Sequence, residues 1–279
     1  MSTVHLLTGE SMPKPDPETH LLTAELESRG VGHRVLPWTD PDAGRGADLV
    51  VVRTPWDYIH RCDEFLRVCR AAEPPVLNPP DVLAWNSHKS YLVELAEAGV
   101  PVVPTRLVRA GEAAALAADE AEVALVVKPA VSSGSRGAGR FEPGDPAAAA
   151  HLADLVEDAD ALVQPYVASV AERGERSLIF LGGEFSHAVD KVPAQGDYRV
   201  QEMYGGRYRA HVPTRAERAA AERALAAAPS AQELLFARVD LVDGAGGPEV
   251  MELELIEPEL FLGFEAAAPR RLADLIAAS

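Results

Sequence analysis

The fold of this chain is decided by one stretch, Val126-Val127-Lys128-Pro129-Ala130-Val131-Ser132-Ser133-Gly134-Ser135-Arg136-Gly137-Ala138-Gly139-Arg140. An apolar run ends in a lysine and is followed by a loop of small residues, which predicts a buried strand leading into a glycine-rich turn. Backbone amides in such a loop can bind phosphate oxygens, while Lys128 supplies a positive charge. The glycines follow neither the Walker order nor the dinucleotide-binding order. We therefore predict a phosphate-binding loop, with a flexible turn as the alternative.

Two acidic segments nearer the C-terminus predict a metal site. Arg238-Val239-Asp240 and Glu252-Leu253-Glu254 resemble an antiparallel strand pair joined by a turn at residues 243–247. Residues two apart on a strand share a face, so the carboxylates of Glu252 and Glu254 can meet one cation. Oxygen ligands suit magnesium, which completes its shell with phosphate oxygens and water. A solvated acidic face is the alternative, and for Glu254 alone it is preferred; the four glutamates within 252–259 favour a bound cation or pairing with Arg238.

Positive charge gathers between residues 185 and 209 of this otherwise acidic chain. Glycines at 196, 205 and 206 lie among a histidine and several cations, which are His187, Lys191, Arg199, Arg207 and Arg209. Local positive charge in an acidic protein suggests a bound anion. The alternative for each cation alone is an exposed side chain, and for His187 a packed strand residue.

The composition restricts the expected partners and compartment. The chain has 279 residues, 47% of them apolar, with 43 acidic against 26 basic residues and a formal net charge of -17. Nucleic acids and anionic membranes bind through Lys and Arg, so neither is an expected partner. Cys62 and Cys69 lie in a helix-like stretch, roughly 10 Å apart along its axis, too far for a disulfide. The sequence shows no export signal and no apolar segment of membrane-spanning length, so we expect a cytoplasmic protein.

The first third of the chain alternates apolar strands with helices. We expect strands at 4–8, 34–38 and 48–53, and helices at 17–30 and 64–72. This alternation predicts a parallel sheet covered on both faces, with ligands at the carboxyl ends of its strands. Arg53, Trp56, Asp57 and Tyr58 fall at such an end, where they either line a substrate pocket or pack among themselves. The proline-rich segment 74–80 is expected to lack regular structure and to close this lobe near residue 83.

The remaining sequence predicts a second α/β unit and then an antiparallel sheet. Helices are expected at 89–98, 112–120 and 146–157, around a strand at 123–128. From residue 161 onward short strands dominate, with Gly182-Gly183 as a hairpin turn and a helix at 214–228. These strands are expected at 162–166, 177–181, 185–191, 236–242 and 250–255. The predicted fold class is α/β, with α+β character in the C-terminal lobe.

In this order the features resemble the ATP-grasp superfamily, specifically the branch that includes prokaryotic glutathione synthetase and the ribosomal-protein glutamate ligases. The resemblance covers about residues 85 to 265 and implies the ATP-grasp fold. It implies an N-terminal pre-ATP-grasp domain at 1–83, a central lobe with the glycine loop at 84–165, and a C-terminal lobe with the metal site at 166–279. Residues 53–58 and 251–258 also resemble small ligases related to the O-ureido-D-serine cyclo-ligase of cycloserine synthesis.

The resemblance implies a role for individual residues. The nucleotide would be bound by two lysines, the glycine loop, a hinge and one acid on the ribose, namely Lys89, Lys128, Ser132, Ser133, Gly134, Ser135, Gly137, Gln164, Tyr166, Val167, and Glu172 or Glu175. The metal ligands would be Asp240, Glu252 and Glu254, the last at a position where the family commonly has asparagine. Arg199, Arg238 and Lys191 would stabilise charge on the transferred phosphate.

The implied reaction is ATP-dependent carbon–nitrogen ligation. A small amino-acid-like carboxylate attacks the γ-phosphate, and an amine then displaces phosphate from the acyl phosphate. Two Mg²⁺ ions, or Mn²⁺ in their place, and the arginines neutralise the developing charge. Loop 132–139 would close to exclude water. In the cyclo-ligase the carboxylate and nitrogen belong to one molecule, whereas in linear ligases they belong to two. Relatives are often dimers through the first lobe, so the resemblance also allows a homodimer.

Two other functions share these residues. A non-catalytic ATP-binding sensor would close the same lobes on ATP, but it has no need of Asp240, Glu252, Arg199 and both lysines together. A small-molecule phosphotransferase would stop at a phosphorylated product. It needs a positioned base for a hydroxyl group, and no motif in the sequence nominates one.

Overall fold

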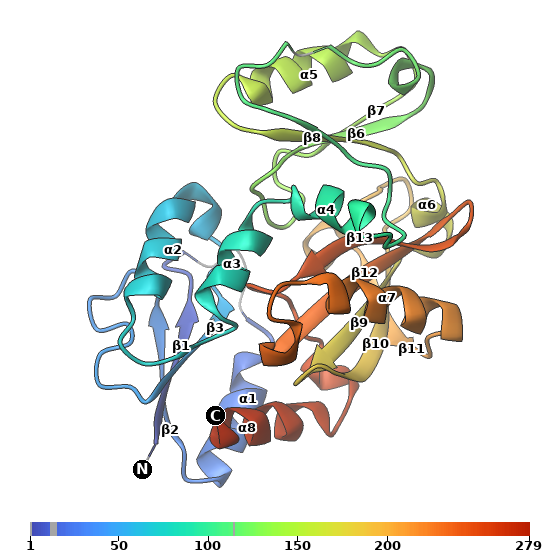
Figure 1. Ribbon diagram of the computed structural model, residues 1–279. Coiled ribbons are helices and arrows are strands. Elements are labelled where there is room, and N and C mark those ends of the chain that lie inside the picture. The colour runs from blue at the N-terminus through green and yellow to red at the C-terminus, as the bar shows by residue number, and fades with distance from the viewer. Residues whose placement is uncertain (1, 12–15, 114) are drawn as a thin grey trace.

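Three sheets organise the chain (Figure 1). The computed structural model describes residues 2–11, 16–113 and 115–279. Along the chain the sheets have strand orders β2-β1-β3-β4, β5-β8-β6-β7 and β11-β10-β9-β12-β13. The first is parallel and the other two are antiparallel, which confirms the predicted α/β class with an antiparallel C-terminal lobe. In the described part of the chain, no helix combines the length and apolar character needed to cross a membrane.

The N-terminal lobe is the alternating unit that its apolar runs predict. Its strands are β1 (Thr3–Thr8), β2 (Gly32–Pro37), β3 (Leu49–Thr54) and β4 (Val76–Leu77). Its helical segments are α1 (Thr19–Ser28), η1 (Tyr58–His60) and α2 (Cys62–Ala71). All six residues of β3 are buried, as expected for a strand covered on both faces.

The proline-rich segment is more regular than we predict from its sequence. Val76 and Leu77 form β4 beside β3, and Pro80 begins helix α3 (Pro80–Ser87), so the expectation of irregular structure over 74–80 is wrong. Proline is tolerated at the first position of a helix, because that backbone N–H would have no helical partner. Prolines before a short edge strand likewise remove no ladder bond.

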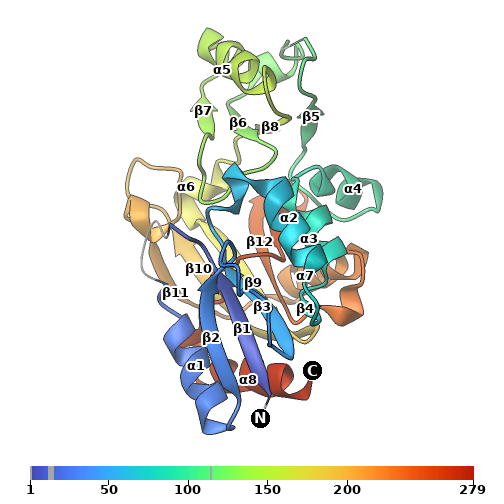
Figure 2. The same cartoon turned by 90° about the vertical axis from the view of Figure 1, so that its left-hand side faces the viewer.

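The central lobe projects from the rest of the molecule (Figure 2). It follows α4 (Tyr91–Glu97) and consists of β5 (Arg106–Val108), η2 (Glu120–Glu122), β6 (Leu125–Pro129), β7 (Gly139–Phe141), α5 (Pro146–Val156) and β8 (Ala161–Pro165). Strand β8 pairs with β5 and β6, so it belongs to this sheet and not to the C-terminal one. The helix predicted at 112–120 is wrong for the described residues 112, 113 and 115–120, which form no α-helix. A short alanine-rich segment without an apolar stripe gains little from packing.

The C-terminal lobe contains the five-stranded antiparallel sheet. Its elements are α6 (Ser169–Arg173), β9 (Glu175–Leu181), β10 (Glu184–Val192), η3 (Glu202–Tyr204), β11 (Arg207–His211), α7 (Arg215–Ala227), η4 (Ala231–Glu233), β12 (Phe236–Gly244), β13 (Gly247–Glu254), η5 (Leu262–Phe264) and α8 (Ala268–Ala278). The predicted β12–β13 hairpin and the turn at Gly182-Gly183 are both confirmed. Helix α8 lies beside α1 (Figure 1), and their apolar residues share one buried cluster.

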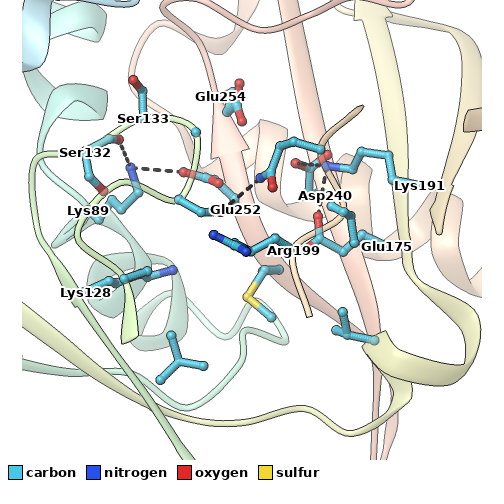
Figure 3. Close-up of a pocket in the computed structure, with 18 of the residues that line it drawn as sticks. Lys89, Lys128, Ser132, Ser133, Glu175, Lys191, Arg199, Asp240, Glu252 and Glu254 are labelled. Atoms are coloured by element: carbon cyan, nitrogen blue, oxygen red, sulfur yellow. Dashed lines mark hydrogen bonds and ion pairs between the residues drawn. The ribbon is translucent and has the colours of Figure 1, made fainter. Parts of the chain in front are cut away.

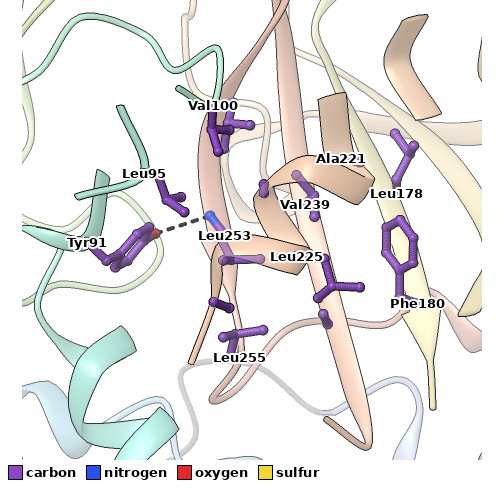
Figure 4. Close-up of a cluster of buried hydrophobic side chains, with 14 of the residues drawn as sticks. Tyr91, Leu95, Val100, Leu178, Phe180, Ala221, Leu225, Val239, Leu253 and Leu255 are labelled. Atoms are coloured by element: carbon purple, nitrogen blue, oxygen red, sulfur yellow. Dashed lines mark hydrogen bonds between the residues drawn. The ribbon is translucent and has the colours of Figure 1, made fainter. Parts of the chain in front are cut away.

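The free edge of β13 is covered by the segment that links the lobes. Asn86 of α3 donates to the Leu253 carbonyl and accepts from the Leu255 amide, both at 2.8 Å. The Tyr91 hydroxyl accepts a hydrogen bond from the Leu253 amide (Figure 4). Asn78 adds a bond to the Leu255 carbonyl. These side chains pair an edge that would otherwise expose backbone groups, and they fix the end of β13 where the acidic residues lie.

Candidate active site

One cavity gathers most of the predicted residues at the junction of the lobes (Figure 3). The predicted residues that line it are Lys89, Lys128, Ser132, Ser133, Gly134, Ser135, Gln164, Tyr166, Val167, Glu175, Lys191, Arg199, Arg238, Asp240, Glu252 and Glu254. Gly137 and Glu172 do not line it. Glu172 is exposed on α6, so the geometry favours Glu175 over Glu172 as the cavity acid.

Gly137 is required by the packing of the loop. A Cβ at this position would lie 2.8 Å from the Pro129 side chain, and its φ is +73°. A side chain is therefore excluded both by space and by backbone conformation. This glycine shapes the loop without lining the cavity.

Strand register places the charged residues on one face of the C-terminal sheet. Lys191 of β10 pairs with Glu175 of β9, and Asp240 of β12 pairs with Glu252 of β13. The Lys191 ammonium lies 2.9 Å from the Glu175 carboxylate and 2.8 Å from Asp240. One lysine therefore joins two strands across the face that forms the cavity wall (Figure 3).

Asp240 is held ionised by two cations. It is 1% exposed, and Arg238 donates two hydrogen bonds of 3.0 Å to it. Burial opposes the ionisation of Asp240, but Arg238 and Lys191 outweigh it and hold the pKa of this carboxyl well below its usual range. The Ser177 hydroxyl adds a hydrogen bond of 2.5 Å. The carboxylate is thus fixed in charge and in orientation.

Three carboxylates converge as a metal site requires. One ligand oxygen from each of Asp240, Glu252 and Glu254 lies within 4.8 Å of the others. A break in the β12–β13 register between Asp240 and Leu241 adjoins this group, and such bulges redirect side chains. Burial raises the pKa of Glu254 to about 7, opposed by Arg238 but reinforced by Glu252 and Asp240. This excess of negative charge is what a divalent cation would relieve, so the donor set fits Mg²⁺ or Mn²⁺.

Glu254 is not the solvated residue that its position alone favours. Its side chain is 22% exposed and forms an ion pair with Arg238. Arg238 therefore bridges Asp240 and Glu254. In the β12–β13 register Arg238 lies opposite Glu254, whereas Asp240 lies opposite Glu252. The cation that the acidic strand requires is present in the fold, as the sequence alternative of a nearby arginine anticipates.

The two lysines lie in different electrostatic surroundings. The Lys89 ammonium donates to the Ser132 carbonyl at 2.6 Å and lies 3.0 Å from Glu252. Among the described residues, no ion pair or hydrogen bond to the Lys128 ammonium is found. Burial lowers the pKa of Lys128, and attraction from Glu252 only partly offsets this effect. An unpaired ammonium in a cavity wall suits a phosphate group.

The glycine loop is held over the cavity by two other segments. The Ser133 hydroxyl donates to the Trp56 carbonyl of the N-terminal lobe at 3.2 Å. From residues 198–204, Tyr198 donates to the Ala138 carbonyl at 3.2 Å and Gln201 to the Ser135 hydroxyl at 3.0 Å. The loop is therefore closed in this structure through single hydrogen bonds at separate points.

Arg199 lines the cavity but is engaged by neighbours. It donates to both carboxylate oxygens of Asp197, and its guanidinium lies 3.8 Å from the centre of the Tyr204 ring. The hydrogen bond from Arg199 holds the pKa of Asp197 at about 2. Arg199 must leave or share this partner to contact a phosphate, whereas Arg238 already faces the carboxylates.

The remaining wall is less polar and suits a nucleotide base. It contains Gln164 and Tyr166 near the end of β8, together with Val126, Val167, Val170, Val200 and Met251. The Gln164 amide donates to Thr105 at 2.8 Å, which fixes its side chain, and Arg140 stacks 4.1 Å from the Tyr166 ring centre. Apolar side chains with a few fixed polar groups are typical of small-molecule pockets.

Of the four N-terminal residues considered for the pocket, Trp56 alone lines the cavity. Asp57 instead accepts hydrogen bonds from the Glu10 and Ser11 amides and from Trp38. Tyr58 is 3% exposed and packs against Phe65, and Arg53 is buried beside Glu18. Both sequence interpretations of this turn therefore apply, to different residues.

Sequence reasoning missed several residues of the site. Asn86, Tyr198, Glu257 and Glu259 line the cavity without having been predicted. The glutamates were visible only as part of an acidic run, and their side-chain directions follow from the irregular segment after β13. Asn86 carried no signal, because an asparagine in a helix can serve many roles.

Comparison with known proteins establishes the family. Residues 95–260 match the ATP-grasp domain of prokaryotic glutathione synthetase, and residues 4–78 match the N-terminal domain of D-cycloserine synthetase DcsG. The chain therefore belongs to the ATP-grasp ligases, enzymes that form amide bonds on small amino-acid-like substrates. This confirms the family resemblance and the predicted ligase class. ATP-grasp ligases use ATP and divalent metals, which agrees with the donor set described above.

Individual relatives cover the whole chain or its ATP-grasp part. The cycloserine biosynthesis protein DcsG of Streptomyces lavendulae is 35% identical over 275 residues, covering 89% of each chain. The crystal structure of D-cycloserine synthetase DcsG superposes with a TM-score of 0.88 at 32% identity, covering 99% of both chains. Glutathione synthetase of Prochlorococcus marinus (strain MIT 9313) is 31% identical over 186 residues, covering 64% of this chain and 57% of that protein.

Proposed function

We propose that this chain is a ring-closing ligase, which joins a carboxylate and a nitrogen of one amino-acid derivative. The observation that carries the proposal is that similarity to DcsG extends through the N-terminal lobe, over 99% of the solved structure. That lobe contributes Trp56 to the cavity, so it takes part in forming the substrate pocket. Similarity to glutathione synthetase covers only 64% of the chain.

The residues divide into three roles in this proposal. Lys89, Lys128 and loop residues 132–135 would bind the ATP phosphates, Gln164, Tyr166 and Val167 the adenine, and Glu175 the ribose. Asp240, Glu252 and Glu254 would hold two Mg²⁺ ions, with Mn²⁺ as the substitute. Bound metal would neutralise charge on the phosphoryl group during transfer. Arg199, Arg238 and Lys191 would assist that neutralisation from the chain itself.

The proposed reaction proceeds in two steps. A carboxylate oxygen of the substrate forms a bond to the γ-phosphorus, and the bond to the β-phosphate oxygen breaks to release ADP. The nitrogen of the same molecule then attacks the carbonyl carbon, phosphate leaves, and the nitrogen loses its proton. Ring closure needs no second substrate, so positioning supplies much of the rate. Closure of loop 132–139 protects the acyl phosphate from water.

The same proposal implies that the substrates are small molecules and that the protein acts in the cytoplasm. Both cysteines are free thiols, as expected in a reducing compartment. A homodimer through the N-terminal lobe stays a prediction, and a change of elution volume with protein concentration would test it.

The decisive experiment measures ADP formation with ATP, Mg²⁺ and O-ureido-D-serine, with products identified by mass. The expected result is ADP with this single substrate and a product that has lost at least the elements of water. ADP that forms only when a second, amine substrate is added would show linear ligation instead and overturn ring closure. Absence of ADP formation with any carboxylate, while ATP still binds, would overturn the assignment of this cavity as the ligase site.

A further inference from the structure

Glu257 is a carboxylate in the cavity that is assigned neither to nucleotide binding nor to metal binding. It lies three residues beyond Glu254 and lines the same cavity as Trp56 and Lys89. Its side chain is partly buried. Burial, together with repulsion from Glu254, raises its pKa to about 8. A carboxyl group in such surroundings is costly unless a ligand compensates it.

The backbone around Glu257 is fixed from both sides. The Trp56 indole donates to the Glu257 carbonyl at 3.0 Å, and Arg238 donates to the Glu259 carbonyl at 3.1 Å. The preceding residue, Ile256, is 1% exposed in the core of the N-terminal lobe. The position of Glu257 is therefore determined by both lobes, and the carboxylate does not reach the cavity through a flexible loop.

The other cavity carboxylates have partners within the chain. Glu175 and Asp240 share Lys191, Glu252 pairs with Lys89, and Glu254 pairs with Arg238. For Glu257, no hydrogen bond or ion pair to its carboxylate is found within residues 2–11, 16–113 and 115–279. Lys89 acts on it only as a more distant charge.

Neither predicted ligand of the cavity supplies the missing partner. Asp240, Glu252 and Glu254 form the converging group of ligand oxygens, and Glu257 is not part of it. A triphosphate is anionic and would be repelled. The remaining occupant is the molecule whose carboxylate is activated, and a group that matches Glu257 must be positively charged or a strong hydrogen-bond donor.

We propose that Glu257 binds the ammonium group of an α-amino acid whose carboxylate lies at the metal site. In an α-amino acid the nitrogen is two bonds from the carboxyl carbon, so one short cavity wall can bind both groups. Trp56, which fixes the Glu257 backbone, brings the N-terminal lobe into the same recognition. Glu257 thus sets the preference for aminated over deaminated carboxylates. The inference rests on the proposed carboxylate activation but does not depend on ring closure.

Hydroxylamine provides a test that is independent of the final nucleophile, because it converts any acyl phosphate into a hydroxamate. The full chain is incubated with ATP, Mg²⁺, hydroxylamine and one of two matched pairs: O-ureido-D-serine with 3-(ureidooxy)propanoate, or D-serine with 3-hydroxypropanoate. We expect the wild type to favour the aminated member by at least about tenfold in kcat/KM, the strength of one charge-assisted hydrogen bond. In Glu257→Gln this preference should fall by about tenfold, through KM of the aminated member, with the deaminated member unchanged.

Two control variants make the outcomes decisive. Glu257→Asp keeps the charge and should retain part of the preference, and Glu122→Gln, at an exposed position, should retain all of it. A Glu257→Gln variant that keeps the preference, loses activity equally on both members, or changes only the Mg²⁺ requirement overturns the inference. Equal use of both members by the wild type also overturns it. Hydroxamate from O-ureido-D-serine in the presence of hydroxylamine, but no cyclic product in its absence, would overturn ring closure and leave the role of Glu257 standing.

Discussion

The cavity has two walls that are held in contrasting ways. On the sheet wall, formed by β10, β9, β12 and β13, charged side chains are paired across strands, as Lys191 is with Asp240 and Glu175. On the loop wall, residues 132–139 form separate hydrogen bonds with Trp56, which accepts from Ser133, and with Tyr198 and Gln201, which donate to the loop. The sheet wall fixes its groups before any ligand arrives, whereas the loop wall is held by few contacts, as the proposed lid requires. Formation of an acyl phosphate, which water hydrolyses, requires both features: preorganised charge for the phosphoryl transfer and a lid that excludes water.

Removal of a charge from the sheet wall should have the largest effect on activity. Glu252→Gln should lower kcat/KM by about 10³-fold, the upper range for losing one preorganised electrostatic group, because it removes a metal ligand and the partner of Lys89. Activity at increasing Mg²⁺ concentrations would measure the loss. Glu249→Gln, on the same strand but away from this cavity, is the matched control. Full activity in Glu252→Gln would remove this residue from the proposed metal site.

The sheet wall also depends on an anchor in the N-terminal lobe. Glu18 accepts hydrogen bonds of 2.7 Å from the Leu260 and Leu262 amides, in the segment after β13. Burial raises the pKa of Glu18 to about 7 from 4.5, although Arg53 opposes the rise. The folded state therefore binds more protons than the unfolded state between these values, and the Glu18 contribution to stability is lost as the pH rises through about 7.

Glu18→Gln isolates this contribution. The difference in free energy of unfolding, wild type minus variant, should decrease by up to roughly 3 kcal/mol between pH 4 and pH 8. Urea denaturation at several pH values measures it, with Glu122→Gln as a control that should give a constant difference. A Glu18→Gln difference that is constant or increases with pH would contradict the protonation of Glu18 in the folded protein.

Lys128 differs from the charged residues of the sheet wall, because it is the cavity lysine without a carboxylate partner among the described residues. Lys128→Met should raise KM for ATP by about 30-fold, near 2 kcal/mol, through loss of a charge-assisted phosphate contact. Removing this ammonium leaves no buried carboxylate unpaired, so the melting temperature should change little. ATP titrations and thermal unfolding measure the two quantities. Unchanged KM, or a large fall in melting temperature, would indicate a structural role in place of phosphate binding.

The sequence predicts the sheet wall well because its signals are local. Two carboxylates at positions 252 and 254 share a strand face, and the turn at 243–247 fixes the hairpin register that pairs Glu252 with Asp240. The contact of Lys191 with Asp240 could not be predicted, because β9 lies between β10 and β12 and pairs with both. The choice between Glu172 and Glu175 depends on Gly174, whose φ of +73° ends α6 before β9 begins.

Long-range anchors leave little trace in the sequence. Asn78 and Asn86 hold backbone groups of β12, β13 and the segment that follows, more than 150 residues away, yet asparagine is equally at home in turns and caps. Glu257 was visible as one of four glutamates, but it lacks a partner among the described residues because Lys89 pairs with Glu252 and Arg238 with Glu254. Spacing can identify ligands on one hairpin, whereas the assignment of partners requires the packed lobes.

The smallest expected effect tests the loop wall itself. Tyr198→Phe removes one hydrogen bond to the Ala138 carbonyl, worth about 1 kcal/mol, so lid closure should weaken without affecting the sheet wall. More acyl phosphate should then be lost to water, and the ratio of ADP formed to ligated product should rise a few-fold, with little change in KM for ATP. Tyr204→Phe, whose bond to the Gly134 carbonyl is longer at 3.4 Å, should give a smaller rise. If Tyr198→Phe couples ADP to product as tightly as the wild type, the Tyr198 hydrogen bond does not control the lid, and the remaining contacts of the loop with Gln201 and Trp56 become the candidates.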